Sequence, residues 1–459
     1  MDIAWKRVTR LWDGTLLFRH LTVGSKEAVF LDSCGRGRYA VLAWDPLRME
    51  ALETGDCRDP FTILDEMLDG VPAADTPEDA PPFISGVIGY LGYESGWDRE
   101  RIGPPKKRRK GIPDACLMVP GKMVILDIEA GETWVAVMTW GQEAGSLLDE
   151  LLERLNRAPL SEAEPTPGRL LVPMTPEIGR EEYRKRVQRV QEYISRGDIY
   201  QANLSYRVEG RLRGEPWELY RFLREANPGA YAAFLRFPGF GVLSSSPEQF
   251  LRWSGKEIET KPIKGTRPRG GSEREDRQLR KELAQSEKDR AELVMIVDLE
   301  RNDFGKFCEI GSVAVPELFS IEPHPTVWHQ SAVVKGRLPS GISAGRILRD
   351  VFPGGSITGA PKLRSMQVIH ELEDGRRGVY TGSIGYVDAR GSAEWNIAIR
   401  TMTWIGTKEA TLSYHVGGGI VADSDPELEY AETLAKGRGM QKAIDVWTAA
   451  GVNEEPVPH

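Results

Sequence analysis

The order of strand-like and helix-like segments constrains the fold of this chain more than any other feature of its sequence. From residue 199 to 207 apolar and polar residues alternate, as in a strand with two different faces. We predict further strands at residues 231–243, 380–388, 393–404 and 410–416. Long helical patterns lie between strands that resemble hairpin neighbours, without a regular strand–helix–strand order. The sequence therefore predicts an α+β fold with antiparallel sheets.

Two proline-rich stretches indicate exposed connections. Residues 69–82 and residues 158–168 are rich in proline, which disfavours both helix and sheet. We place the domain boundary at the second stretch, which gives an N-terminal region of residues 1–157, a linker of residues 158–174 and a larger domain of residues 175–448. That domain is expected to open with a helix at Thr175 and Pro176.

Composition excludes several classes of function. The chain has 459 residues, 40% of them hydrophobic, and a net charge of −8, so it lacks the positive surplus of a nucleic-acid-binding protein. No stretch reaches the roughly 18 apolar residues that cross a bilayer, so no membrane partner is expected either. The four cysteines form no C-x-x-C motif and the first residues show no secretory leader, which fits a reducing cytoplasm.

Two pairs of acidic residues stand at helical spacing. Ser286 is placed to cap a helix on which Asp289 and Glu292 share a face. Glu292 falls on an apolar stripe, where a carboxylate is costly unless it is paired or binds a metal. A paired acid at the edge of the helix is the simpler interpretation.

The second pair is Glu429 and Glu432, after a cap at Asp425 and a proline at Pro426. A surface ion pair between Glu432 and Lys436 would explain this spacing equally well. Two such pairs together would suit a hard cation such as Mg²⁺, which binds a few carboxylates and waters.

Two glycine-rich runs are candidates for binding an anion. Residues 352–362 contain three glycines before a helix expected near Pro361, and residues 417–419 are three consecutive glycines. Neither run is a Walker A loop, and a tight turn without a ligand is an open alternative for each.

A third group of candidates is cationic or polar. In residues 261–269, a lysine crowded by Lys261, Arg267 and Arg269 would have a lowered pKa and act as a nucleophile, although a surface loop is equally plausible. Glu248 follows Ser246 and Pro247 at the expected start of a strand, a position from which its carboxyl could point into a cleft. His329 is either a site residue or a hydrogen-bonded core histidine.

Taken in order, these segments resemble the chorismate-utilising enzymes. The likeness is strong over residues 180–445 and weaker in the N-terminal region. It rests on the motifs GDIYQANLS at 197–205, SPE at 246–248, PIKGT at 262–266, AELVMIVDLERND at 291–303, SITGAPK at 356–362, AIRT at 398–401 and GGGIV at 417–421. The lysine of PIKGT, Lys264, is typical of the aminodeoxychorismate synthase branch of the family, whereas anthranilate synthases typically carry alanine there.

The resemblance implies the fold and the site. The fold would consist of large antiparallel sheets packed face to face with helices outside, as in component I of anthranilate synthase, with a chorismate-binding domain at residues 175–448.

Mg²⁺ would be ligated by Glu292 and Glu432, with Asp289 and Glu429 close by. Lys264 would be the nucleophile, Glu248 the general acid, and His329 and Thr358 would position the ring. The remaining substrate contacts would be Gln201, Tyr380, Arg400, Gly418, Gly419 and Lys436. Because isochorismate and salicylate synthases carry a lysine base where this chain has Gln201, activation of water at C2 is not expected.

The resemblance also implies a partner. The reaction would replace the 4-hydroxyl of chorismate with an amino group, for p-aminobenzoate and folate synthesis, and the ammonia would come from a separate glutamine amidotransferase subunit. The alternatives are an anthranilate synthase and a catalytically inactive regulatory subunit. Tryptophan-sensing relatives carry Leu-Leu-Glu-Ser where this chain has Phe-Leu-Asp-Ser at residues 30–33, so a tryptophan site is an open question.

Overall fold

The fold is built from two arms of antiparallel strands. The computed structural model describes residues 1–53, 56–97, 99–104, 106, 111–141, 143–161, 163–324 and 327–449. All strand pairings among these residues are antiparallel, as the sequence predicts. The arms separate at β5, one edge of which pairs with β6 and, further along, with β4.

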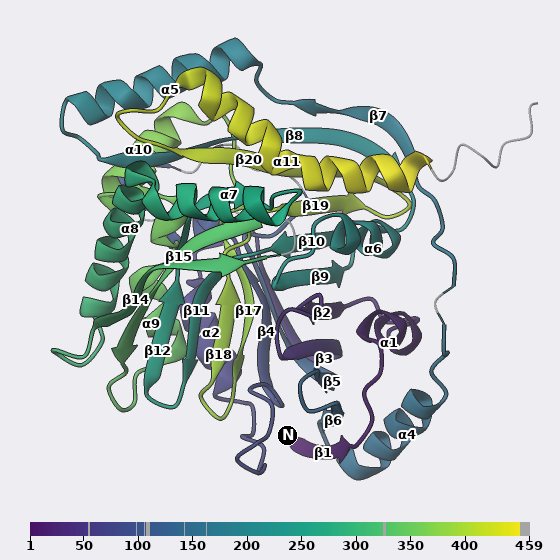
Figure 1. Cartoon of the computed structure of the whole chain (residues 1–459). Coiled ribbons are helices and arrows are strands. Elements are labelled where there is room, and N and C mark those ends of the chain that lie inside the picture. Colours follow the sequence, from purple (N-terminus) through teal and green to yellow (C-terminus); the bar gives the residue numbers. More distant parts are fainter. Residues whose placement is uncertain are drawn as a thin grey trace, which may run out of the picture.

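The first arm rises in Figure 1 from β1 at the bottom to β7 and β8 at the top. Its strands, in spatial order, are β1 (Asp2–Val8), β6 (Glu132–Thr139), β5 (Ala115–Asp127), β3 (Tyr39–Leu52), β2 (Ala28–Asp32), β9 (Tyr231–Phe237), β10 (Phe240–Ser246), β19 (Thr401–Gly406), β20 (Glu409–Ile420) and β8 (Gln201–Arg213), with β7 (Arg169–Pro176) and β16 (Gly359–Ala360) on the far edge of β8.

The second arm continues from the same central strand. Its members are β4 (Gly86–Leu91), β17 (Ser383–Asp388), β18 (Ala393–Asn396), β11 (Gln249–Ser254), β12 (Glu257–Lys261) and β15 (Val327–Arg337), with β13 (Ile263–Pro268) and β14 (Ala314–Pro323) on its last edges.

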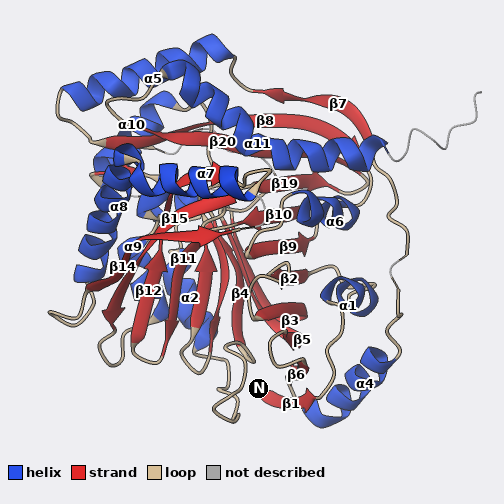
Figure 2. Cartoon of the chain, viewed as in Figure 1, coloured by secondary structure: helices blue, strands red, loops and turns tan. Residues whose placement is uncertain are grey.

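Helices cover the outside of these layers, as Figure 2 shows for α1, α4, α5 and α11. The longer helices are α1 (Gly14–Leu21), α2 (Pro60–Leu68), α4 (Ala144–Asn156), α5 (Arg180–Ser195), α6 (Pro216–Ala226), α7 (Glu273–Gln285), α8 (Glu287–Gly305), α9 (Ala344–Val351), α10 (Lys362–Leu372) and α11 (Pro426–Ala449), and shorter turns of helix are η1 (Tyr93–Gly96), α3 (Arg99–Ile102) and η2 (Gly355–Ile357). In the described part of the chain, no helix has both the length and the apolar character needed to cross a membrane.

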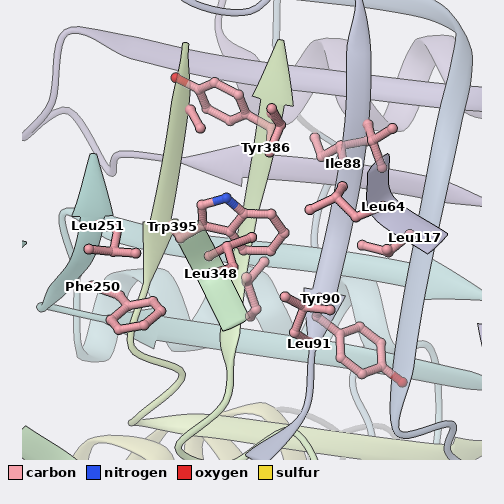
Figure 3. Close-up of a cluster of buried hydrophobic side chains, with 14 of the residues drawn as sticks. Leu64, Ile88, Tyr90, Leu91, Leu117, Phe250, Leu251, Leu348, Tyr386 and Trp395 are labelled. Atoms are coloured by element: carbon pink, nitrogen blue, oxygen red, sulfur yellow. The ribbon is translucent and has the colours of Figure 1, made fainter. Parts of the chain in front are cut away.

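The apolar side chains form two cores, one on each face of the first arm. One core lies between the first arm and the second and also takes in residues of α2 and α9. Figure 3 shows part of it, with Trp395 of β18 among Leu64, Tyr90, Leu251 and Leu348. The other core packs α1, α4, α5, α6 and α11 onto the opposite face of the first arm. The two arms therefore pack face to face across a shared apolar layer.

The predicted regions share these sheets. β2 pairs with β9, and β4 pairs with β17, so strands of residues 1–157 lie in the same layers as strands of residues 175–448. The division at residues 158–174 stays a prediction. The chain after α4 runs along the outside of the molecule in Figure 1, but residues 169–174 belong to β7, which pairs with β8.

Several predicted element boundaries are wrong. The strand expected at residues 231–243 is a hairpin of two strands, β9 and β10, and the strand expected at residues 380–388 begins only at Ser383. The helix expected at Thr175 begins at Arg180, because Thr175 and Pro176 end β7. The single strand expected at residues 393–404 is two strands, β18 in the second arm and β19 in the first. The chain crosses between the arms at residues 397–400, and Arg400 there has a φ of 51°.

Candidate active site

A cavity of about 630 Å³ lies among α8, α11, β13 and β20. Most of the residues predicted for the site line it, although they come from segments spread over almost 190 positions between Glu248 and Lys436. They are Glu248, Lys264, Asp289, Glu292, His329, Tyr380, Arg400, Gly419, Glu429, Glu432 and Lys436. The exceptions are Gln201, Thr358 and Gly418.

The two acid pairs converge in this cavity. Ser286 caps α8 by accepting a hydrogen bond from the Asp289 amide, which places Asp289 and Glu292 in the first turns of the helix. Asp425 caps α11 in the same way, and Glu429 and Glu432 follow.

The acids influence one another electrostatically. Burial raises the pKa of Glu292, and the charges of Asp289 and Glu429 raise it further, against the opposing effect of Lys264 and Lys288. Burial also raises the pKa of Glu429, and the charge of Glu432 adds to this effect. Such a concentration of negative charge requires compensation by cations.

Glu432 is held differently. It forms the predicted ion pair with Lys436, at 2.6 Å. Burial would raise the pKa of Glu432, but the charge and hydrogen bond of Lys436, together with the charges of Lys288 and Lys264, outweigh burial and lower it. The Glu432–Lys436 ion pair is therefore present, and so is the gathering of the two acid pairs around one cavity.

The carboxylates fit a divalent cation that they would share with water and substrate. Glu429 is 3% exposed, yet its Oε2 atom has no hydrogen-bond partner, whereas Oε1 accepts a bond from Ser424. A Cβ atom on Gly418 would lie 3.2 Å from this orphaned oxygen and 3.9 Å from Glu432 Oε1, so the glycine keeps that space open. Within the described ranges, no three His, Cys, Asp or Glu side chains form a ready metal cage. Mg²⁺ is usually held by one or two carboxylates with waters and substrate oxygens, and it needs no such cage.

Glu248 is buried at the base of the cavity, two residues after the end of β10. Its main-chain carbonyl accepts a hydrogen bond from Ile397, and Oε1 has no partner. Burial raises the pKa of the Glu248 carboxyl, and Ser356 and Lys264 oppose this effect. A carboxyl that stays protonated to higher pH is suited to general acid catalysis.

Lys264 lines the same cavity as the acid groups. Its Nζ donates a hydrogen bond to the carbonyl of Ser356 at 3.1 Å. Its charge lowers the pKa of Glu248, Glu292 and Glu432, and all four residues line the cavity. The next residue, Gly265, has a φ of 80°, and a Cβ atom there would meet Asp289 at 2.9 Å. Glycine is therefore required for β13 to pass this close to α8.

The three cations that were expected to crowd Lys264 are paired elsewhere. Lys261 contacts Glu322 at 2.8 Å, Arg267 contacts Asp289 at 2.9 Å and Arg269 contacts Asp276 at 2.7 Å. Each of these positive charges therefore has a carboxylate partner. The partners offset the repulsion that the three cations were expected to exert on the Lys264 side chain.

His329 is a neutral ring at the edge of the cavity. Its Nδ1 is 2.9 Å from the hydroxyl of Thr266, and its ring lies edge-on to that of His324 at 4.7 Å. Burial lowers the pKa of His329 to about 3, and the nearby His324 and Arg400 contribute. The ring can therefore take part in a hydrogen bond without adding charge.

Tyr380 and Arg400 form the far wall. Tyr380 is 6% exposed and stacks on His415 with ring centroids 5.0 Å apart. Burial raises the pKa of Tyr380 to about 12. Burial lowers the pKa of Arg400, against the effect of Tyr380 and Glu432. A half-buried guanidinium beside a phenol is suited to binding a carboxylate.

Three predicted site residues do not line the cavity and are Thr358, Gln201 and Gly418. Thr358 is buried and donates its hydroxyl hydrogen to the carbonyl of Gly354. Gln201 is buried with both amide atoms unpartnered, against Gly419. Gly418 lies in β20 opposite Leu204, so residues 417–419 are part of a sheet ladder and not a separate loop of free amides. In the run 352–362, the amide of Gly355 is likewise occupied, by Glu300.

Sequence reasoning gave no role to several residues that line the cavity. Asn203, Ser356 and Lys288 lie within sequence motifs, whereas no motif includes His415 or Arg438. His415 precedes the glycines of β20 by two residues, and alternation along a strand could have placed it on the cavity face.

A second, smaller cavity includes Leu31, Asp32 and Ser33, the stretch that differs from tryptophan-sensing relatives. Asp32 accepts hydrogen bonds from Arg224 and Tyr220. This carboxylate is therefore already bound by protein groups.

Comparisons with known proteins agree with the geometry. Residues 26–442 match the family model described as chorismate binding enzyme. Aminodeoxychorismate synthase component 1 of Salmonella typhimurium is 39% identical over 411 residues, which cover 87% of this chain and 88% of that protein. Anthranilate synthase component 1 of Streptomyces coelicolor is 38% identical over 446 residues, or 92% of this chain and 84% of that protein. The crystal structure of anthranilate synthase component I from Streptococcus pneumoniae has a TM-score of 0.76 at 31% identity, over 88% of this chain and 92% of that one.

These comparisons confirm the predicted resemblance and the predicted fold class. The family match includes most of the N-terminal region as well as the strands and helices around the cavity. With a match of this length and the family's motifs gathered around one cavity, the chain belongs to the chorismate binding enzymes.

Proposed function

We propose that the chain aminates chorismate at C4 and so forms 4-amino-4-deoxychorismate, the precursor of p-aminobenzoate in folate synthesis. The observation that carries the proposal is the position of Lys264, with its amine in the cavity beside Glu248 and hydrogen bonded to Ser356. The similarity to aminodeoxychorismate synthase component 1 supports it.

The reaction divides into two displacements. The Lys264 amine attacks C2 of the ring, the double bond shifts, and the C4–O bond breaks. Glu248 gives the departing hydroxyl a proton, so it leaves as water, and the resulting Glu248 carboxylate takes up the proton that the attacking amine loses. Ammonia then attacks C4, the double bond shifts back, and the C2–N bond to Lys264 breaks, while a proton passes from the attacking nitrogen to the departing lysine nitrogen. Chorismate and ammonia thus become the 4-amino product and water.

The acid residues would hold Mg²⁺, with Glu292 and Glu432 as ligands and Asp289 and Glu429 nearby. When bound, the cation would neutralise the ring carboxylate of chorismate. The orphaned Glu429 oxygen beside the open space at Gly418 supports this assignment. Arg400 and Tyr380 would bind the other carboxylate of the substrate, with Lys436 close to the site.

We propose that ammonia comes from glutamine through a partner amidotransferase subunit. A glutaminase needs a reactive thiolate. Burial raises the pKa of Cys34 to about 12 and that of Cys308 to about 11, and it also raises the pKa of Cys116. These three thiols are therefore poor nucleophiles, and the fourth, the exposed Cys57, has no histidine among the described residues that line the cavity beside it, which supports a separate source of ammonia.

Product identification tests the proposal. The purified chain, with chorismate, Mg²⁺ and an ammonium salt, should give the para-substituted 4-amino product. The similarity to anthranilate synthase component 1 makes the ortho product, anthranilate, the specific competing outcome. Anthranilate as the main product would contradict the proposal.

Lys264→Ala tests the nucleophile. We expect 4-amination to fall by orders of magnitude, and intact-protein mass spectrometry of the wild type should detect an adduct on Lys264. Lys261→Ala is the matched control, because Lys261 is three residues away, pairs with Glu322 and lies outside the cavity lining. Near-normal 4-amination by Lys264→Ala would show that the lysine is not the nucleophile.

A further inference from the structure

Arg377 is a buried arginine close to the cavity, and every N–H group of its guanidinium donates a hydrogen bond. Its side chain is 2% exposed. Nε and one terminal nitrogen bind the two oxygens of Glu373, at 3.0 and 2.7 Å. The remaining donors bind the carbonyls of Ile357 and Asn203 and the hydroxyl of Thr381. All five N–H groups of the guanidinium therefore have an acceptor.

The acceptors belong to three different walls of the cavity. Asn203 is in β8 and Ile357 is in η2, and both line the cavity. Ile357 directly follows Ser356, whose carbonyl accepts the hydrogen bond from Lys264. Neither Arg377 nor Glu373 lines this cavity.

The third wall is the segment that carries Tyr380. The Arg377 guanidinium carbon lies 5.8 Å from the centre of the Tyr380 ring. The next residue, Thr381, has a φ of 60°, which is a strained conformation for a β-branched side chain. Its hydroxyl accepts a hydrogen bond from Arg377 and donates one to the carbonyl of Tyr380. The arginine thus helps to hold the backbone turn that presents Tyr380.

Glu373 fixes the arginine from the other side. Its Oε1 accepts hydrogen bonds from the amide and the hydroxyl of Ser205, at 2.8 and 2.9 Å. Ser205 lies in β8, two residues from Asn203. The ion pair is therefore anchored to the same strand whose carbonyl the arginine binds.

We propose that Arg377, oriented by Glu373, is a positioning residue that locks β8, η2 and the Tyr380 turn into the arrangement that binds and aminates chorismate. The proposal rests on the proposed function. It assigns the pair a role beyond stability, because a guanidinium that joins three separate segments sets their relative positions. A lysine could keep the charge but could not make the bidentate bond together with the bonds to two carbonyls.

The test compares kinetics with stability. Removing one member of a buried ion pair leaves an unpaired charge, so the main variant is the double substitution Glu373→Leu with Arg377→Met, which removes both charges at similar volume. We expect kcat/KM for chorismate to fall about 100-fold in the folded double variant, with a rise in KM because Tyr380 is displaced. Arg377→Lys is the second variant, with an expected tenfold fall, and it keeps the test open if the double variant does not fold.

The matched control is Glu218→Leu with Arg221→Met, a buried helical ion pair on α6 outside the cavity. Its kcat/KM per folded molecule should stay within twofold of the wild type, whatever its melting temperature. If the folded double variant, or Arg377→Lys where the double variant does not fold, keeps kcat/KM within twofold, the pair is only structural and the proposal is overturned. If the wild type itself does not aminate chorismate, the proposed function fails instead, so the two failures are distinguishable.

Discussion

At the scale of single residues, the site contains side chains that are costly for the fold. Glu248 is 6% exposed and has an oxygen without a partner. Arg400 and Thr381 adopt backbone conformations that few non-glycine residues tolerate. Such features are retained where the surrounding structure enforces them, and they cluster at functional sites.

Glu248→Gln should abolish loss of the C4 hydroxyl, because the amide cannot donate the proton that the carboxyl donates. We expect the loss in kcat, by about 10²-fold or more, with little change in KM. Steady-state kinetics with an ammonium salt measures both. An effect confined to KM would identify Glu248 as a binding residue instead.

The same substitution should change the pH dependence of stability. Burial raises the pKa of Glu248 in the folded chain, so its favourable contribution is present below the pKa of the unfolded chain. That contribution is lost as the pH rises through the raised pKa of the folded state. Glu248→Gln should therefore raise the melting temperature at neutral pH but not at pH 4. Exposed Glu257→Gln is the control, and equal shifts at both pH values would contradict this explanation.

At the scale of elements, two capped helices and one glycine-containing strand form the acidic end of the cavity. The caps at Ser286 and Asp425 fix where α8 and α11 begin, and each acid pair follows within two turns. β20 passes beneath them with no side chain at Gly418. The space between the carboxylates is therefore set by the meeting of three elements.

Gly418→Ala should weaken Mg²⁺ binding without unfolding the protein. The added methyl group would lie 3.2 Å from Glu429 Oε2 and would displace the groups around it. We expect the Mg²⁺ concentration for half-maximal activity to rise at least tenfold, and calorimetric titration with Mg²⁺ should show the same loss. Gly145→Ala in α4, where nothing lies within 4 Å of the added carbon, is the control. An unchanged Mg²⁺ affinity would place the cation elsewhere.

At the scale of the whole molecule, the apolar layer between the arms keeps the walls of the cavity together. Lys264 lies in β13 of the second arm and Glu248 directly precedes β11 of the same arm, whereas β20 belongs to the first. The N-terminal region contributes strands to both arms, since β2 pairs with β9 in the first arm and β4 pairs with β17 in the second. The N-terminal region is therefore part of the scaffold of the site.

Trp395→Ala should be strongly destabilising, because the indole is fully buried between the arms (Figure 3). Truncating a buried tryptophan costs about 3–5 kcal/mol. Trp140, which is 57% exposed, provides the control, and its replacement should change stability by about 0.5 kcal/mol or less. Thermal unfolding of the two variants measures the difference, and equal melting temperatures would contradict this account of the core.

The source of the ammonia concerns the whole chain and its proposed partner subunit. The isolated chain should use ammonium salts but not glutamine, and addition of the amidotransferase subunit should allow it to use glutamine. Hydrolysis of glutamine by the purified chain alone would contradict the proposed division of labour.

The sequence by itself determined the local features of this protein. Capping residues predicted where α8 and α11 begin, and alternation predicted that residues 202, 204 and 206 share one face of a strand. Helical spacing placed Asp289 with Glu292 and Glu429 with Glu432. These properties depend on contacts within a few residues, which the sequence order already specifies.

Only the tertiary structure decided how those pieces act on one another. It paired Lys261, Arg267 and Arg269 with distant carboxylates, split residues 393–404 between two arms, and joined Arg377 to three walls of the cavity. Such contacts depend on the register and packing of strands far apart in the chain. Local propensity contains no information about which strands become neighbours, so these features could not be predicted from residue patterns alone.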